Sequence, residues 1–277
     1  MPRSRAAGAL CVCAVLVAAS GAARAGGPGD ATILRGVPYA QRGGSALRLD
    51  AYLPAARNGR VPAVIFVHGG AWHSGDRREF ETQATELARH DGFAAFAIDY
   101  RAEPPARFPA AIADVAAAVS WVRGHAGEYR VDGARIGIWG ESAGANLAAV
   151  VAARGRGRID RGSRVRAVVS WSGPLDLRAL AGSRDVSTYI GCRLRVCPGR
   201  YRQASATSYV DRTDPAVLLI NSAHELVPLS QPRGLARLLA RAGVPHRLTV
   251  LPGNRHGLAY AATAFAPSLA FLRARLR

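Results

Sequence analysis

One segment has the residue types and the order of a nucleophile turn. Residues 140–144 read Gly-Glu-Ser-Ala-Gly and lie between an apolar run that ends at Trp139 and an Ala-rich stretch. Small residues on both flanks of a serine permit the sharp strand-to-helix turn that lifts its hydroxyl clear of a sheet. The helix amino terminus also favours developing negative charge. Ser142 is therefore the candidate nucleophile, although such a string also occurs in ordinary turns.

A second glycine-rich segment follows another apolar run. Residues 68–72 read His-Gly-Gly-Ala-Trp, and adjacent glycines let backbone amides approach a substrate oxygen that bulkier residues would obstruct. We predict an oxyanion hole formed by the amides of Gly70, Ala71 and Ala143. The alternative is a plain strand-to-helix turn. We expect His68 to brace this loop rather than act as a base, because it precedes the hole.

A candidate general base lies near the carboxyl end of the chain. Residues 252–257 read Pro-Gly-Asn-Arg-His-Gly and connect the last predicted strand to the last predicted helix. A glycine-flanked loop at the carboxyl end of a strand can bring an imidazole above the sheet to a serine hydroxyl. Of the seven histidines, His256 alone combines this loop with a late position in the chain. The alternative is a solvated loop histidine.

Apolar periodicity predicts the elements that must position these residues. Two alternating segments are typical of an opening antiparallel pair, and continuous apolar runs that alternate with helical patterns follow them. The predicted strands are Ile33–Tyr39, Leu47–Leu53, Val61–Val67, Phe93–Asp99, Arg135–Trp139, Val165–Trp171, Ala216–Asn221 and His246–Leu251. The predicted helices are Arg78–His90, Ala110–Arg123, Ala143–Arg154, Leu229–Arg241 and Ala264–Leu276. This order predicts an α/β fold, a mostly parallel central sheet with helices on both faces.

Residues 174–215 break this rhythm. They contain many arginines and no long apolar period, so we interpret them as an excursion over the carboxyl edge of the sheet, where ligands bind in open α/β sheets. Cys192 and Cys197 lie within the excursion. In an oxidising compartment the pair predicts a disulfide. The alternatives are free thiols or half of a metal site, but no further ligands cluster around the two cysteines.

The first 25 residues have the three parts of a secretory signal peptide. Arg3 and Arg5 precede an apolar stretch, and small residues end at Ala25. We predict cleavage after Ala25 and a secreted or cell-envelope protein with one catalytic domain at residues 26–277. The apolar stretch is short for an uncleaved membrane anchor, and no later segment qualifies as a span. The sequence carries no feature that predicts an oligomeric state.

The basic composition favours no nucleic-acid partner. The formal net charge is +18, and removal of Arg3, Arg5 and Arg24 with the leader lowers it to +15. Every basic residue other than histidine is arginine, a bias that fits GC-rich coding. The arginines are scattered without a basic stripe or interleaved aromatic residues, so we predict no specific nucleic-acid binding, although weak attraction to acidic surface polymers is compatible with this charge.

Together these motifs resemble a known enzyme group. From about Leu47 to the carboxyl end, the chain resembles α/β-hydrolases of the esterase/lipase group, which includes hormone-sensitive-lipase-like and bacterial deacetylase/feruloyl-esterase-like enzymes. The segments that carry the resemblance are 49–54, 68–72, 99–101, 108–110, 140–144 and 252–257. The resemblance implies an α/β-hydrolase fold and hydrolysis of a small-molecule carboxylic ester through an acyl-enzyme, without a metal or cofactor.

The chain departs from this group at the acid of the catalytic triad. Relatives carry an aspartate four residues before a Val-Pro proline, and here His224 occupies that position. A neutral imidazole cannot offset the imidazolium charge that forms on the base, and loss of the orienting carboxylate costs on the order of 10⁴ in turnover. Glu225 is the nearest substitute, and Asp176 is a second candidate that equally suits a helix cap. The third alternative is that no acid is present.

Two functions follow from these alternatives. The first is a secreted serine carboxylesterase for small or medium acyl esters, with Ser142, His256 and Glu225 as its catalytic residues. The second is a catalytically impaired hydrolase fold that serves as a binding protein, with His224 as the lesion. A peptidase or amidase on the same scaffold is a further alternative.

Overall fold

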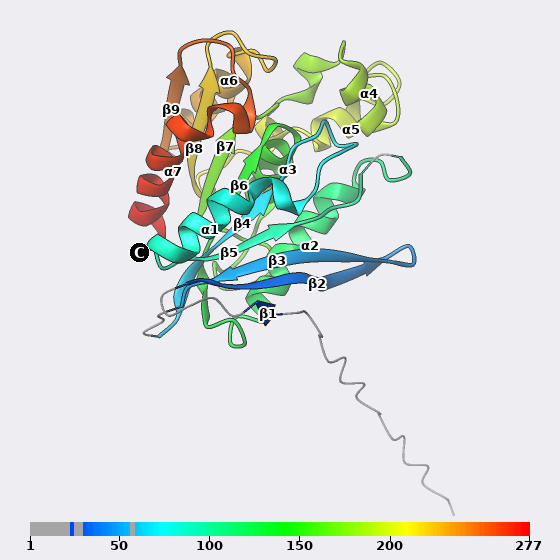
Figure 1. Cartoon of the computed structure of the whole chain (residues 1–277). Coiled ribbons are helices and arrows are strands. Elements are labelled where there is room, and N and C mark those ends of the chain that lie inside the picture. The colour runs from blue at the N-terminus through cyan, green and yellow to red at the C-terminus, as the bar shows by residue number, and fades with distance from the viewer. Residues whose placement is uncertain (1–22, 25–29, 56–58, 103) are drawn as a thin grey trace, which may run out of the picture.

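A mixed β-sheet forms the centre of the computed structural model (Figure 1). The structure describes residues 23–24, 30–55, 59–102 and 104–277. Its sheet has nine strands in the order β1-β2-β3-β5-β4-β6-β7-β8-β9. The pairs β1–β2, β2–β3 and β3–β5 are antiparallel, and the other neighbouring pairs are parallel. The predicted opening antiparallel pair and mostly parallel sheet are therefore confirmed.

The strand bounds agree closely with the apolar runs. The strands are β1 Ala23–Arg24, β2 Thr32–Arg42, β3 Ser45–Leu53, β4 Val61–Val67, β5 Ala94–Ile98, β6 Val131–Glu141, β7 Ala167–Trp171, β8 Ala216–Ser222 and β9 His246–Leu251. Strand β6 begins four residues earlier than predicted, because Val131 already pairs with Val61 across an irregularity in the ladder. The predicted signal peptide lies outside the described residues except for Ala23 and Arg24, which form β1.

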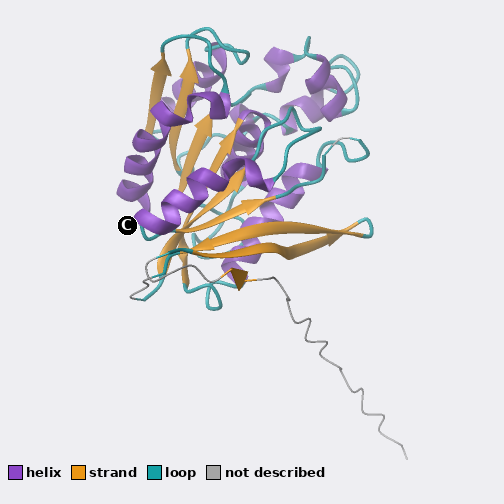
Figure 2. Ribbon diagram, in the orientation of Figure 1, coloured by secondary structure: helices purple, strands orange, loops and turns teal. Residues whose placement is uncertain are grey.

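Helices cover both faces of the sheet (Figure 2). The longer helices are α1 Glu81–His90, α2 Ala110–Gly124, α3 Ser142–Arg154, α6 Ser230–Arg241 and α7 Ala261–Leu276. Buried side chains of α1 and α7 share one core, and those of α2, α3 and α6 share the other. In β4, Ile65 faces one core while Val64 and Phe66 face the other. A strand covered on both faces must be apolar throughout, which explains its continuous run.

Two segments differ from the predicted helices. The first turn of the helix predicted at Arg78–His90 is a 3₁₀ helix, Arg77–Phe80, which begins where the Asp76 side chain accepts a hydrogen bond from the Arg78 amide. The excursion contains short helical pieces. These are Leu177–Leu180, α4 Arg184–Ile190, α5 Pro198–Gln203 and Ala206–Ser208, and Gly257–Tyr260 is a further 3₁₀ turn before α7. Among the described residues, no helix has the length and apolar character needed to cross a bilayer.

The excursion lies beside the carboxyl edge of the sheet. In Figure 1, α4 and α5 lie at the same end of the molecule as the arrowheads of β8 and β9. Asn146, which is buried on α3, donates hydrogen bonds of 3.0 Å to the carbonyls of Pro174 and Ala204. One side-chain amide therefore holds two separate segments of the excursion against α3.

Candidate active site

Ser142 lies at the sharp turn from β6 into α3. Its φ is +50°, a left-handed conformation that is uncommon for residues other than glycine and that often marks a functional site. Gly144 allows this turn to pack, because a Cβ there would collide with the Val67 and His68 carbonyls at the end of β4. The local sequence thus places the serine hydroxyl above the carboxyl edge of the sheet.

Three side chains from separate loops form a continuous chain of hydrogen bonds. The Ser142 hydroxyl lies 2.8 Å from Nε2 of His256, and Nδ1 of His256 is bonded to Oε2 of Glu225. A neutral imidazole that donates from Nδ1 can accept the serine proton at Nε2. This arrangement has the order of groups required for general-base activation of a serine nucleophile.

The loop after β8 explains why the acid is Glu225 rather than residue 224. The His224 amide donates to the Gly253 carbonyl at 3.0 Å, and its side chain is exposed. The Glu225 carboxylate turns inward and is fully buried, and its Oε1 accepts the Ser222 amide at 2.8 Å. The alternative acid is occupied elsewhere: Asp176 caps the helical turn at Leu177 and pairs with Arg178 at 2.8 Å.

The impaired-hydrolase hypothesis depended on the missing carboxylate at position 224. Glu225 supplies a carboxylate to the His256 imidazole. The acid that is missing at position 224 is therefore replaced by the next residue in the chain. The same loop connects β8 to α6 near Val227, which lines the cavity beside Ser142.

The predicted oxyanion loop has an unusual backbone. Gly70, Ala71 and Trp72 are consecutive residues with φ of +90°, +50° and +66°. The Gly70 carbonyl accepts the amides of His73 and Ser74, both at 3.0 Å, which closes a tight turn. Only glycine adopts positive φ without strain, so nothing in the sequence predicts this conformation at Ala71 and Trp72. Ala71 and Ala143 line the same cavity as Ser142, as an oxyanion hole requires.

His68 braces the loop from behind, as expected. Its ring stacks on Tyr100 with centroids 4.2 Å apart. The Tyr100 hydroxyl lies 2.8 Å from the Gly69 carbonyl and 3.0 Å from that of His68. Burial lowers the pKa of His68, which favours its neutral form. The residue therefore supports the loop by packing behind it.

A cavity of about 150 Å³ opens beside the nucleophile. Its lining includes Ala71, Trp72 and Ala143, and the excursion supplies Leu180 and Val186. Ser183 and Asp185 add polar side chains, and the largely exposed Leu226 adds an apolar one. The wall composition suits a short apolar acyl group.

Aromatic stacking connects the oxyanion loop to the excursion. The indole of Trp72 is stacked on the Tyr189 ring of α4, with centroids 4.7 Å apart and planes 4° apart. Phe108 packs edge-on against the same Tyr189 ring at 6.1 Å. Such pairs add roughly 0.5–1.5 kcal/mol beyond their area burial, so the excursion and the loop that it covers are held together.

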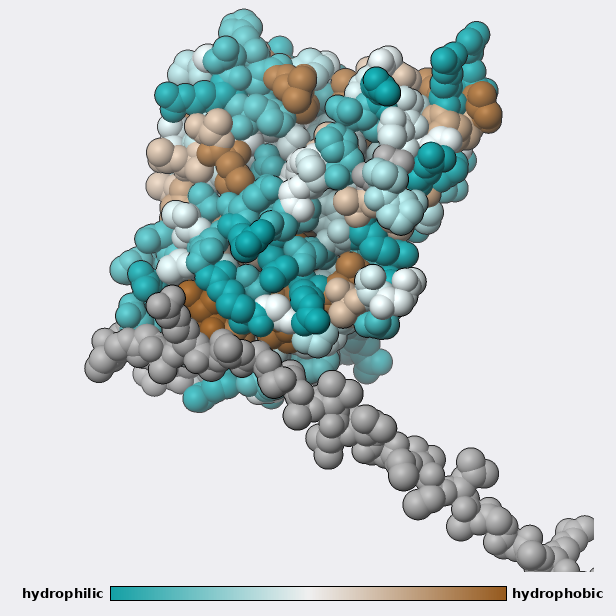
Figure 3. Space-filling view, turned by 45° about the vertical axis from the view of Figure 1, so that its right-hand side comes forward, coloured by the Kyte–Doolittle hydropathy of each residue, from teal (hydrophilic) through white to brown (hydrophobic). Residues whose placement is uncertain are grey.

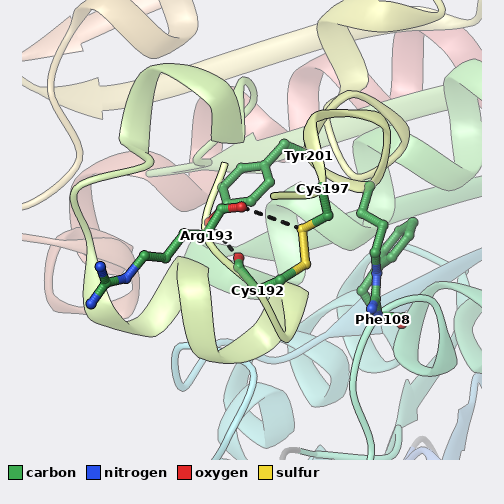
Figure 4. The surroundings of a disulfide bond; sticks show 6 residues. Phe108, Cys192, Arg193, Cys197 and Tyr201 are labelled. Carbon is green, nitrogen blue, oxygen red and sulfur yellow. Dashed lines mark hydrogen bonds between the residues drawn. A yellow bond between two sulfur atoms is a disulfide. The ribbon is translucent and has the colours of Figure 1, made fainter. Parts of the chain in front are cut away.

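The predicted pairing of Cys192 with Cys197 is present (Figure 4). The Arg193 carbonyl accepts hydrogen bonds from the Val196 amide at 2.9 Å and from the Cys197 amide at 3.2 Å. The Tyr201 hydroxyl donates to the Cys192 carbonyl at 2.9 Å, and the Arg193 side chain points away from the bond. The disulfide therefore closes one turn between α4 and α5.

A buried acid that the sequence did not single out adjoins the nucleophile. Glu141 is 6% exposed, and a Cβ on either Gly69 or Gly257 would collide with its carboxyl group. Burial raises the pKa of Glu141 to about 7, against the opposing influence of His256. The carboxyl group therefore contacts the loops on both sides of Ser142. Its position inside the nucleophile motif was the only signal in the sequence.

Known proteins are similar to this chain in sequence. The BD-FAE family model matches residues 49–239, which include the glycine-rich loop, the nucleophile turn and Glu225. Esterase LipQ of Mycobacterium tuberculosis is 29% identical over 218 residues, which are 74% of this chain and 52% of LipQ. An acetyl esterase of Salmonella paratyphi B is 31% identical over 159 residues, 57% of this chain and 49% of that protein. The chain thus spans about half the length of these relatives.

Solved structures match over more of their length. A truncated carbohydrate esterase from gut microbiota superposes with a TM-score of 0.77 at 26% identity, covering 89% of this chain and 97% of that protein. A thermophilic esterase of Thermogutta terrifontis with bound propionate gives a TM-score of 0.74 at 25% identity, covering 89% and 94%.

Proposed function

The chain belongs to the BD-FAE family, within the esterase/lipase group of α/β-hydrolases, and from this premise we propose that it is a serine carboxylesterase. The observation that carries the proposal is the 2.8 Å contact between Ser142 Oγ and His256 Nε2, with Glu225 bonded behind the imidazole. The esterase names of its relatives support the reaction class.

In the first half of the reaction, Ser142 attacks the ester carbonyl while His256 takes the hydroxyl proton. The buried Glu225 carboxylate offsets the positive charge on the imidazolium. The amides of Gly70, Ala71 and Ala143 stabilise the oxyanion, and His256 then donates its proton to the departing alcohol. The serine–acyl bond forms as the bond between carbonyl carbon and alcohol oxygen breaks.

In the second half, water hydrolyses the acyl-enzyme. His256 accepts a proton from the water molecule, the resulting hydroxide adds to the acyl carbon, and the proton returns to Ser142 as the carboxylic acid departs. The cavity of about 150 Å³ beside Ser142 supports short acyl groups as substrates. The acyl preference can be measured with a series of nitrophenyl esters of increasing acyl length. From the size of such a cavity, we expect kcat/KM to fall when the acyl group is longer than about four carbons.

The direct test is Ser142→Ala together with a fluorophosphonate probe. We expect the purified wild type to be labelled on the peptide that contains Ser142 and to hydrolyse short esters, because only an activated serine reacts at a useful rate. Ser142→Ala should abolish both while melting near the wild-type temperature, since alanine is small enough for the turn. Labelling on another peptide, or residual hydrolysis above a small fraction, would show that the nucleophile is a different residue.

A further inference from the structure

Behind the acid of the proposed triad lies a buried serine that the mechanism above does not use. Ser172 follows β7 directly, has no exposed surface and has a φ of +51°. Its Oγ lies 2.9 Å from Oε1 of Glu225 and 2.8 Å from the Tyr260 hydroxyl, and it accepts the Gly257 amide at 2.9 Å. A non-glycine residue held at positive φ costs free energy that the surrounding contacts must offset.

The available protons determine the direction of these bonds. Ser172 has one hydroxyl proton, and two oxygen atoms lie near enough to accept it: the Glu225 carboxylate and the Tyr260 hydroxyl. The ionised carboxylate is the stronger acceptor. The Tyr260 hydroxyl has a proton of its own, which it can donate to Ser172 Oγ at 2.8 Å or to the Ile220 carbonyl at 2.9 Å. Ser172 therefore donates to Glu225.

Two donors thus converge on one oxygen of the acid. Glu225 Oε1 receives the Ser172 hydroxyl and the Ser222 amide, at 2.9 and 2.8 Å, so Oε2 faces Nδ1 of His256. Glutamate has one more rotatable bond than the aspartate of related enzymes, so its carboxylate needs more restraint to hold one geometry. Ser172 also binds the amide of Gly257, the residue after His256.

We infer that Ser172 is a positioning residue that holds the Glu225 carboxylate and the His256 loop in register, with Tyr260 as its support. The inference rests on the proposed function, because it assigns a role within the same triad. Ser172 is hydrogen-bonded to Glu225 and to the Gly257 amide, next to His256. Among the described residues it makes no hydrogen bond to Ser142, whose partner is His256.

The main variant is Ser172→Ala. We expect kcat to fall roughly 10- to 100-fold with little change in KM, the size of effect typical of one hydrogen bond to a charged group. We also expect the acid limb of the kcat/KM profile to move to lower pH, because an unrestrained carboxylate stabilises the His256 imidazolium less. Glu141 is the other carboxyl group next to this loop, so the profiles are repeated in a Glu141→Gln background.

The strand offers a matched control. Ser170 lies two residues earlier on β7, is 1% exposed, and among the described residues its Oγ has no hydrogen-bond partner. Ser170→Ala removes an equally buried hydroxyl and should leave kcat and the acid limb unchanged. Tyr260→Phe should cost less than Ser172→Ala, since the Ser172 proton still reaches Glu225. If Ser172→Ala does not fold, Ser172→Cys retains a weak donor of similar size and should show the same limb shift at smaller amplitude.

Removing the acid provides the last test. In a Glu225→Gln background Ser172 has no carboxylate to hold, so adding Ser172→Ala should lower kcat by a smaller factor than it does in the wild type, and the remaining effect reflects its bond to the Gly257 amide. Ser172→Ala, or Ser172→Cys in its place, is compared with Ser170→Ala in kcat and in the pH of the acid limb. If the two do not differ while Glu225→Gln loses most of its kcat, the positioning role is wrong and the proposed triad stands. If the wild type neither hydrolyses esters nor reacts with fluorophosphonate, the proposed function fails, and the positioning role fails with it.

Discussion

At the scale of single residues, the shift of the acid from position 224 to 225 is explained by direction and length. Residues 223–227 form a turn followed by bends, so the side chains at positions 224 and 225 point in different directions. Here the backbone of His224 is tied to Gly253, its ring faces solvent, and Glu225 faces His256. The additional methylene of glutamate offsets the altered starting position.

We predict that Glu225→Gln lowers kcat by about 10³–10⁴ with little change in KM, because the carboxylate stabilises charge that forms only in the transition state. Steady-state kinetics on a short nitrophenyl ester measures this. His224→Asp in the damaged background should recover little of the loss, since the side chain at position 224 faces solvent and not His256.

His224→Ala serves as the control for this cycle. Its ring is exposed, so activity should stay within about twofold of the wild type, as expected for a surface substitution. If Glu225→Gln retained most of its activity, Glu225 would not be the triad acid. If Asp176→Asn instead lost most of its kcat, the acid would be Asp176 in the excursion.

At the scale of elements, three loops meet at the carboxyl edge around Glu141. The turn after β4 contributes Gly69, the β6–α3 turn contributes Glu141 itself, and the loop after β9 contributes Gly257. Side chains at either glycine position would displace the carboxyl group, so close packing of these loops depends on glycine at both. The protonation state of Glu141 therefore affects the stability of all three.

We predict that stability decreases with rising pH because of Glu141. Burial raises the pKa of this carboxyl group from 4.5 to about 7 in the folded state. Its contribution to stability is fully present below pH 4.5 and is lost as the pH rises through about 7, because the folded state binds the proton more tightly than the unfolded state. A shift of this size corresponds to about 3 kcal/mol.

Urea unfolding of the wild type and Glu141→Gln at pH 5 and pH 8 tests this prediction. Glutamine mimics the protonated acid, so the variant should lose less unfolding free energy than the wild type between the two pH values. Other titrating groups are common to both proteins and cancel in the comparison. Parallel losses in the two proteins would show that Glu141 does not titrate differently in the folded state.

At the scale of the whole molecule, exposed arginines have acidic partners. The candidate site lies at the carboxyl edge of the sheet beside the excursion, and the face shown in Figure 3 is largely hydrophilic with scattered hydrophobic residues. Arginines on the surface pair with acids in several places, such as Arg158 with Asp160 and Arg156 with Asp211. Exposed pairs of this kind contribute little stability each.

We propose that the chain is exported and cleaved after Ala25, which would remove β1 along with the leader. Expression in a bacterium with the leader attached should yield extracytoplasmic protein whose amino-terminal sequence begins at Gly26. Edman sequencing or intact mass measures this. Ala25→Leu should impair cleavage, because signal peptidase requires a small residue there. An exported protein that retains Met1 would contradict the prediction.

The sequence by itself determined the fold and marked two candidate catalytic residues. Continuous β-branched runs and helical periods depend on which faces are buried, so they predict strands and helices locally. Ser142 and His256 are recognisable because each lies in a short segment whose glycines shape the local turn. The family resemblance of these segments to esterases predicted the same architecture that the structure shows.

Only the tertiary structure decided which carboxylate faces the base. Glu225 and His256 are 31 residues apart and come from different loops, and the choice between Glu225 and Asp176 depends on how those loops pack. Nothing in the sequence indicated the left-handed backbone of Ala71 and Trp72 or the buried contacts of Ser172. Long-range contacts and the strain that they offset have no local sequence signature, because each partner alone satisfies the rules of an ordinary turn.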